Sequence, residues 1–175
     1  MKKSRNTSSM ALYRIRMFGD PTLRDQARPV TEFDEQLRQL IDTMFELMDQ
    51  AEGVGLAATQ IGVQKQIAVW RHPESEEGYV LINPRFLDRS EEIVVGNEGC
   101  LSVPGCSLDV PRAERVVVEA CDGAGQCYTV EAEGLVARIL QHEMDHLEGR
   151  LILDRATPEE RRRVLKQLRE QALEP

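Results

Sequence analysis

Two histidines four residues apart, His142 and His146, constrain this sequence more than any other feature. They belong to an HExxH motif inside a predicted helix over about 135–147, where apolar residues have helical spacing. Residues four apart share one helix face, so both imidazoles can bind one metal ion while Glu143 acts as a general base. The alternative is a solvated, charged helix end that binds no metal.

A third protein ligand would complete the site and leave one tetrahedral position open for water. Ile152 stands where HExxHxxGxxH proteases carry their third histidine, so that class is disfavoured. His72 is interpreted as an exposed loop residue. Cys100 remains a candidate, because glycine precedes it and the turn-rich string SVPG follows closely. Glutamates of a highly charged terminal stretch are weaker candidates, namely Glu159, Glu160, Glu170 and Glu174.

The chain has 175 residues, a length that predicts one domain with a substantial core. Its 30 Asp and Glu against 22 Lys and Arg give a net charge of −8, which disfavours DNA and general nucleic-acid binding. The longest apolar runs, such as 67–70 and 116–118, are too short to span a membrane. We therefore expect a globular protein with neither DNA nor a membrane as a partner.

The four cysteines match neither a CxxC pair nor a secretory disulfide framework. This predicts free thiols in a reduced, cytoplasmic protein, with Cys106, Cys121 and Cys127 as structural or incidental thiols. The first nineteen residues are basic and contain no acid, so an organelle-targeting segment is the alternative. We expect a flexible leader over 1–13, a catalytic domain over 14–156, and a surface helix of the same domain over 157–175.

The order of helical and strand patterns predicts an α+β domain, with mostly antiparallel sheets around the central helix that carries HExxH. Apolar residues at three- and four-residue spacing predict a long amphipathic helix that Thr31 caps and Gly53 ends. The string DGAG at 122–125 predicts the turn of a β-hairpin. The predicted strands are 65–70, 79–83, 91–95, 115–120 and 126–131.

The last segment predicts a charged surface helix that Thr157 caps. Four-residue spacing predicts ion pairs between Glu159 and Arg163 and between Lys166 and Glu170. We interpret this helix as a solvated face, with transient contact to ribosomal RNA as the alternative. Its apolar stripe is Val164, Leu165 and Leu168, and its basic cluster is Arg155, Arg161, Arg162, Arg163, Lys166 and Arg169.

Three strings resemble the signature motifs of the peptide deformylase family in their order and approximate spacing. They are GVGLAATQ at 53–60, EGCLS at 98–102 and QHEMDHLEG at 141–149, supported by DPTLR at 20–24, LINP at 81–84 and EAEGLVAR at 131–138. The resemblance covers about 14–154. It implies a hydrolase that removes the formyl group from the N-terminal N-formylmethionine of nascent polypeptides and releases formate.

The resemblance also implies roles for individual residues. The implied metal ligands are Cys100, His142 and His146, and the implied general base is Glu143. Gln60 and the backbone N–H of Leu101 resemble the donors to the formyl oxygen, and one such donor contributes ~3 kcal/mol in comparable sites. The implied cofactor is one divalent ion, Fe²⁺, with Zn²⁺, Ni²⁺ or Co²⁺ able to substitute, because a Cys/His₂ set accepts several first-row ions.

Substrate binding is expected from the same motifs. Gly53 and Gly55 allow the chain to turn and its backbone to approach an extended peptide. Asp145 and Arg112 are expected to orient metal ligands, with surface ion pairing as the alternative. Candidates for an apolar pocket around the methionine side chain, with ordinary core packing as the alternative, are Val54, Leu101, Leu135 and Ile139.

The sequence departs from the family pattern at a few positions. Cys106 and Ser107 stand where some relatives carry a basic residue that touches the substrate backbone, and Asn97 replaces a frequent acid. Two rival functions remain: a metalloendopeptidase, and a catalytically silent structural-metal or ribosome-binding module. Glu143 argues against the silent module, because a structural metal site needs no base.

Overall fold

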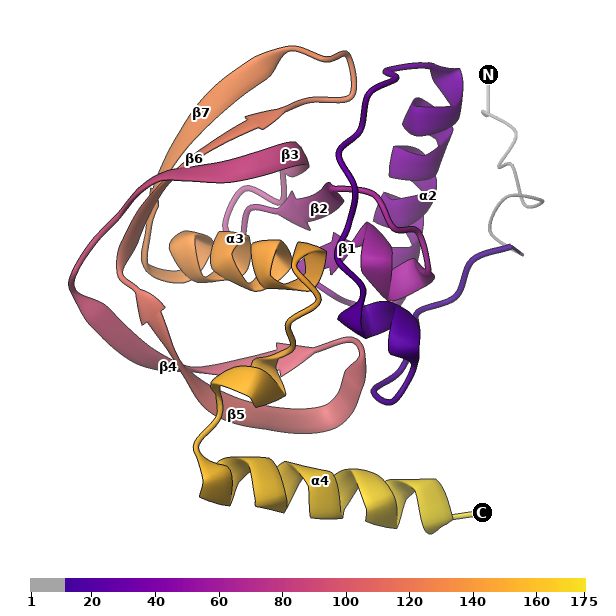
Figure 1. Cartoon of the computed structure of the whole chain (residues 1–175), viewed down its shortest axis with the longest axis vertical. Helices are drawn as coiled ribbons and strands as arrows, with labels where there is room; N and C mark the ends of the chain where they lie inside the picture. Colours follow the sequence, from indigo (N-terminus) through magenta and orange to yellow (C-terminus); the bar gives the residue numbers. More distant parts are fainter. Residues whose placement is uncertain (1–11) are drawn as a thin grey trace.

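The computed structural model describes residues 12–175, and at its centre helix α3 (Gly134–Leu147) lies between two antiparallel sheets (Figure 1). The larger sheet has the strand order β1-β2-β3-β6-β7, and the smaller sheet pairs β4 with β5. The predicted α+β class with a central HExxH helix is therefore confirmed. The strands are β1 (Gly55–Ala57), β2 (Ile67–Arg71), β3 (Gly78–Arg89), β4 (Ile93–Cys100), β5 (Val103–Ala113), β6 (Arg115–Cys121) and β7 (Cys127–Glu133).

The remaining helices lie outside the sheets. The short 3₁₀ helices are η1 (Pro21–Arg24), η2 (Ala58–Ile61) and η3 (Ile152–Arg155), and the longer α-helices are α2 (Glu35–Gln50) and α4 (Pro158–Leu173). Within residues 12–175, no helix is both long enough and apolar enough to cross a membrane. Residues 1–11 of the expected leader lie outside the described residues.

Three apolar clusters hold these elements together. One packs α3 against the inner face of the larger sheet, with Leu140 and Val116 fully buried. A second packs α2 against the same sheet through Met44, Met48 and their neighbours. The third joins β5, η3 and α4, where Val164 is fully buried. The helix that carries HExxH is thus packed through its apolar side chains against the larger sheet, which fixes its position.

The ends of α2 differ from the prediction. The side chain of Asp34 accepts from the backbone N–H of Leu37, so Asp34 and not Thr31 caps the helix. After the last turn the residue with positive φ is Glu52 at 56°, so the predicted stop at Gly53 is wrong by one residue. The backbone N–H of Gly53 still donates to the oxygen of Met48, which closes the helix end.

Two strands escaped the sequence prediction. β1 has only three residues, too few to show an alternating pattern. β5 contains two prolines, and the sequence predicts a turn-rich setting only at its start, yet its residues alternate between buried and exposed over most of its length. It has one strand neighbour, and an edge strand tolerates proline because one side of its backbone needs no ladder donor. The five predicted strands all exist, and β3 and β4 extend well beyond their predicted ends.

The predicted hairpin is confirmed, but its cysteines are not free. Cys121 and Cys127 face each other across β6 and β7 and form a disulfide, with Cα atoms 3.9 Å apart. The prediction that these two are free thiols is therefore wrong. Spacing along the sequence missed the pair because the hairpin register, not a CxxC pattern, brings the two residues together. Cys100 and Cys106 are free.

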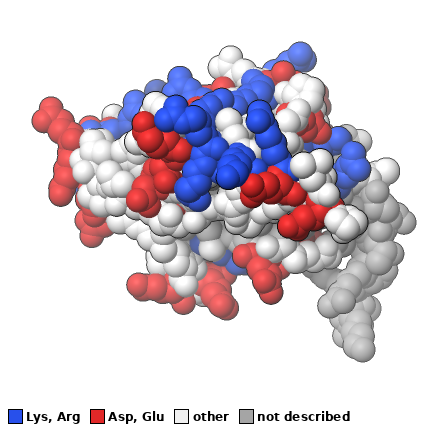
Figure 2. Space-filling view, turned by 90° about the horizontal axis from the view of Figure 1, so that it is seen from below, with Lys and Arg blue, Asp and Glu red and all other residues white. Residues whose placement is uncertain are grey.

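Helix α4 lies on the outside of β5 (Figure 1). Thr157 accepts from the backbone N–H of Glu160, which confirms the predicted cap. The Lys166–Glu170 pair is present at 3.9 Å, but the predicted partner of Arg163 is wrong, because Glu160 takes that place. Figure 2, seen from the side of α4, shows Lys and Arg gathered over this face with acidic groups beside them.

Candidate active site

Three ligand-type atoms meet where the end of β4 passes α3. The Nε2 atoms of His142 and His146 lie 3.1 Å apart, and Cys100 Sγ lies 3.4 Å from His146 Nε2. Ordinary bond lengths in a tetrahedral site would separate two nitrogens by about 3.3 Å and a nitrogen and sulfur by about 3.6 Å. All three atoms lie within 4.8 Å of one another, so the structure brings the predicted ligand set together with separations that suit one small ion.

The tautomer of His142 is set by a neighbouring carboxylate. Glu98 Oε1 lies 2.9 Å from His142 Nδ1, so this nitrogen donates and leaves the Nε2 lone pair facing the other two ligands. Burial alone would raise the pKa of Glu98, but hydrogen bonds from Arg112 and His142 outweigh it and lower that pKa to about 2. A charged Glu98 is therefore available to orient the histidine.

Glu98 belongs to a buried network of charges. Arg112, 4% exposed, donates to both oxygens of Glu98 at 2.9 Å and to Asp145 at 2.5 Å. Arg138 donates to Glu98 at 2.7 Å, and Arg155 donates to both oxygens of Asp145 at 2.6 Å. One continuous series of alternating charges, Arg138–Glu98–Arg112–Asp145–Arg155, therefore holds α3 against β4 and β5. Surface ion pairing is the wrong interpretation for Arg112 and Asp145, which are both buried.

Sequence reasoning missed the roles of Glu98, Arg138 and Arg155 in this network. Two signals were available. Glu98 stands two residues before the candidate ligand Cys100, and alternate strand residues share one face. Arg138 stands four residues before His142, one turn away on the same helix face. Nothing in the spacing of Arg155 indicates that it reaches back to Asp145.

Glu143 places a buried carboxylate at the site. It is 3% exposed, and its Oε2 has no hydrogen-bond partner within residues 12–175. Burial raises the pKa of Glu143 to about 7, a value suited to taking and returning a proton near neutral pH. A Cβ at Gly55 would lie 2.3 Å from Glu143 Oε1, so only glycine lets β1 pass this close.

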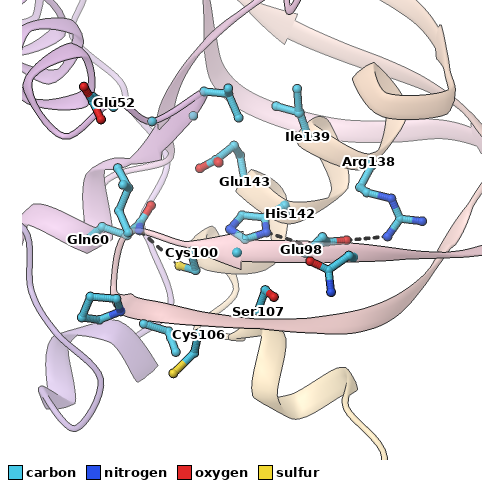
Figure 3. Close-up of a pocket in the computed structure, with 18 of the residues that line it drawn as sticks. Glu52, Gln60, Glu98, Cys100, Cys106, Ser107, Arg138, Ile139, His142 and Glu143 are labelled. Carbon is cyan, nitrogen blue, oxygen red and sulfur yellow. Dashed lines mark hydrogen bonds and ion pairs between the residues drawn. The ribbon is translucent and has the colours of Figure 1, made fainter. Parts of the chain in front are cut away.

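Gln60 approaches the cluster from η2. Its Oε1 accepts from the backbone N–H of Ala57 at 2.9 Å, which turns the amide nitrogen toward the site. That nitrogen donates to Ser102 Oγ at 3.1 Å and lies 3.6 Å from Cys100 Sγ. Figure 3 shows Gln60, Cys100, His142 and Glu143 side by side, with Cys106 pointing away from them.

These groups line a cavity of about 670 Å³. The four residues predicted to hold a methionine side chain all lie on its wall, together with Gly55. Ile139 is 5% exposed, whereas Val54 and Leu135 are 54% and 58% exposed. The apolar residues therefore extend from the interior of the cavity to its mouth, as a site for an extended apolar substrate requires.

The alternative third ligands lie elsewhere. Ile152, at the position of the third histidine of HExxHxxGxxH proteases, is buried in the apolar cluster that joins β5, η3 and α4. Its side chain has no atom that could bind a metal ion. Glu159, Glu160 and Glu170 lie on α4, where each pairs with an arginine or lysine. Glu174 lies just beyond that helix and is exposed. His72 accepts from the backbone N–H of Glu74 in a surface turn.

The fold and the site together define a hydrolase of the HExxH class in which a cysteine from a strand completes the candidate metal-binding set. Comparison with known proteins identifies the family within this class. The polypeptide deformylase family model matches residues 12–162. A peptide deformylase of Alkalilimnicola ehrlichii is 45% identical over 161 residues, which are 91% of this chain and 90% of that protein.

Solved structures agree. A peptide deformylase from Thermotoga maritima superposes with a TM-score of 0.80 at 44% identity and covers 83% of this chain and 98% of its own. One from Synechococcus elongatus, in complex with actinonin, gives 0.86 at 40% identity over 93% and 92%. The chain belongs to the polypeptide deformylase family, whose members are metal-dependent hydrolases.

Proposed function

We propose that this protein hydrolyses the formamide of N-formylmethionine at the start of nascent polypeptides and releases formate. The observation that carries this proposal is the position of Glu143. Its carboxylate is buried and lacks a partner within residues 12–175, and it lies on the wall of the same cavity as Cys100 and His142. Burying a carboxylate without a hydrogen-bond partner lowers the stability of the fold. A site that only bound a metal ion would gain nothing from this carboxylate in return.

The roles of the protein groups follow from their chemistry. Glu143 takes a proton from the attacking water and returns it to the departing amine. The amide nitrogen of Gln60 and the backbone N–H of Leu101 donate to the formyl oxygen as it becomes negative. A divalent ion held by Cys100, His142 and His146 would supply Lewis acidity to this reaction. Val54, Leu101, Leu135 and Ile139 surround the methionine side chain, and the Gly55 backbone approaches the peptide.

We further propose Fe²⁺ as the working ion, with Zn²⁺, Ni²⁺ and Co²⁺ able to replace it, because thiolate and imidazole ligands accept all four. The catalytic domain spans 14–156, with 157–175 as a surface helix of the same domain. We propose that the protein works in the cytoplasm, where polypeptide synthesis would supply this substrate, with an organelle as the alternative. The ion pairs along α4 favour a solvated face, and a transient ribosome contact through the basic residues of this helix is the alternative.

The test is release of formate from formyl-Met-Ala-Ser by anaerobically purified protein of known metal content. We expect formate and intact Met-Ala-Ser in equal amounts, loss of activity with a chelator, and recovery with Fe²⁺ or Ni²⁺. A matched reaction with longer formylated peptides separates the endopeptidase alternative. Internal peptide cleavage, or full metal content without formate release, would contradict the proposal.

A further inference from the structure

The outer edge of β5 has an unusual covering. β5 pairs with β4 on one side and has no strand on the other, so part of its backbone lacks ladder partners. Gly105, Ser107 and Asp109 are alternate residues, whose backbone groups point to the same edge of a strand. Helix α4 runs along this edge and provides the missing partners with side chains.

Three side chains of α4 make these contacts. Gln167 Nε2 donates to the oxygen of Gly105 at 3.0 Å, and Arg163 Nη2 donates to the oxygen of Ser107 at 2.9 Å. Glu160 takes the third position, next to Arg163. Hydrogen bonds from Arg163 and from the backbone N–H of Asp109 both lower the pKa of Glu160.

The spacing of the side chains along α4 matches the spacing of the backbone groups along β5. Glu160, Arg163 and Gln167 are three and four residues apart, so they form one stripe on the helix. The stripe covers about 10 Å of helix, and β5 from Gly105 to Asp109 covers about 13 Å of strand. The order is antiparallel, because the first helix residue meets the last strand residue. The helix side chains thus act along β5 as a neighbouring strand would.

The stripe is itself held in place. Glu160 accepts from Arg163 Nε and Nη2 at 3.2 and 2.9 Å, which orients the guanidinium toward Ser107. At Gly105, where φ is +69°, an added Cβ would lie 2.9 Å from Gln171 Nε2. Glycine at this position therefore allows both the turn of the strand and the close approach of α4.

The covered segment is also a wall of the substrate cavity. Pro104, Gly105, Cys106 and Ser107 all line it, opposite the Glu52–Gly55 segment. Figure 3 shows β5 passing below the reactive groups. Resting on the proposed function, we propose that Arg163 and Gln167 are positioning residues for peptide binding, because they fix the backbone of this wall from outside.

The experiment compares steady-state constants for formyl-Met-Ala-Ser. In the Arg163→Ala/Gln167→Ala variant we expect KM to rise about 5- to 10-fold, since up to two backbone hydrogen bonds are lost. The value of kcat and the metal content should stay as in the wild type. Gln167→Glu keeps the shape but removes the donor, so its KM should also rise, whereas Arg163→Lys keeps a donor and should restore most of the binding.

Arg162→Ala is the matched control, because Arg162 lies on the same helix and pairs with the exposed Glu159 at 3.4 Å. Hydrogen exchange of the 103–109 amides gives a readout independent of activity, and it should accelerate in the double variant and not in the control. Unchanged KM and unchanged exchange in the double variant and in Gln167→Glu would overturn the positioning role. A wild-type protein that releases no formate would contradict the proposed function alone, and the exchange experiment would still decide this inference.

Discussion

Helices α3 and α4 carry similar charged residues in opposite environments. On α3, Glu143, Asp145 and His146 are between 1% and 7% exposed, and arginines from other elements surround Asp145. On α4, the side chains of Arg162 and Lys166 are 71% and 78% exposed and pair within their own helix. The first helix uses charge to bind elements together, and the second uses it mainly to stay solvated.

The difference shows that residue type alone does not decide how much a charged side chain contributes to stability. Breaking a buried, hydrogen-bonded ion pair typically costs about 3–5 kcal/mol, because a desolvated charge is left without its partner. An exposed pair typically contributes about 0–1 kcal/mol and weakens in salt. Variants matched between the two regions should therefore differ strongly in their effects.

The two free cysteines give the largest expected contrast. Cys100 faces α3 and the two histidines, whereas Cys106 packs in the cluster that includes Val164 of α4. Cys100→Ala should abolish tight metal binding because it removes one of three ligands, and Cys106→Ala should keep the metal. Elemental analysis of both proteins checks this. Full metal content in Cys100→Ala would refute the ligand assignment.

Two glutamates give the next contrast. Glu143→Gln should lower formate release by at least ~10²-fold while fold and metal content stay the same, because the amide cannot take a proton. Glu159→Gln on α4 changes an exposed carboxylate in the same way and should leave activity unchanged. Both rates are measured at matched metal content. An active Glu143→Gln protein would remove Glu143 from the mechanism.

Two arginines compare stability. Arg112→Ala should lower the free energy of unfolding by about 3 kcal/mol or more, because Glu98 and Asp145 keep their buried charges and lose a shared partner. Arg162→Ala should change it by less than about 0.5 kcal/mol. Urea unfolding of the metal-free proteins measures both values. Equal losses would mean that burial does not separate the two regions.

The smallest effect is expected at Lys166. Its pair with Glu170 spans 3.9 Å between exposed side chains, so Lys166→Ala should cost about 0.3–0.5 kcal/mol at low salt. The difference from the wild type should vanish at high ionic strength. Thermal unfolding at two salt concentrations checks this. A loss that persists in high salt would point to packing of the lysine stem instead.

The central helix and its reactive residues were predictable because their signal is local. HExxH places three groups on one helix turn, and the apolar spacing around it predicts the helix itself. Cys100 was separable from the other candidates through its turn-rich setting and its motif. The predicted pocket residues lie on the cavity wall for the same reason, since they belong to those motifs.

Features that depend on long-range contacts were not predictable. The disulfide needs the register of β6 and β7, and the contact between Arg155 and Asp145 needs the path of η3 after α3. The third case is β5, whose prolines and glycine resemble a loop until α4 covers its edge. In each case the contacting residue lies in another element of the fold. Residue spacing predicts contacts within one helix or strand and not contacts between elements.

The ligand set joins parts of the chain that fold at a distance from one another. Cys100 and His146 are 46 residues apart, and Gln60 lies a further 40 residues before Cys100. The three ligand atoms come within reach of one ion only when β4 has packed against α3, because Cys100 belongs to the strand and both histidines to the helix. High-affinity metal uptake should therefore be a late event in folding, so the ion reports a finished domain and does not nucleate one.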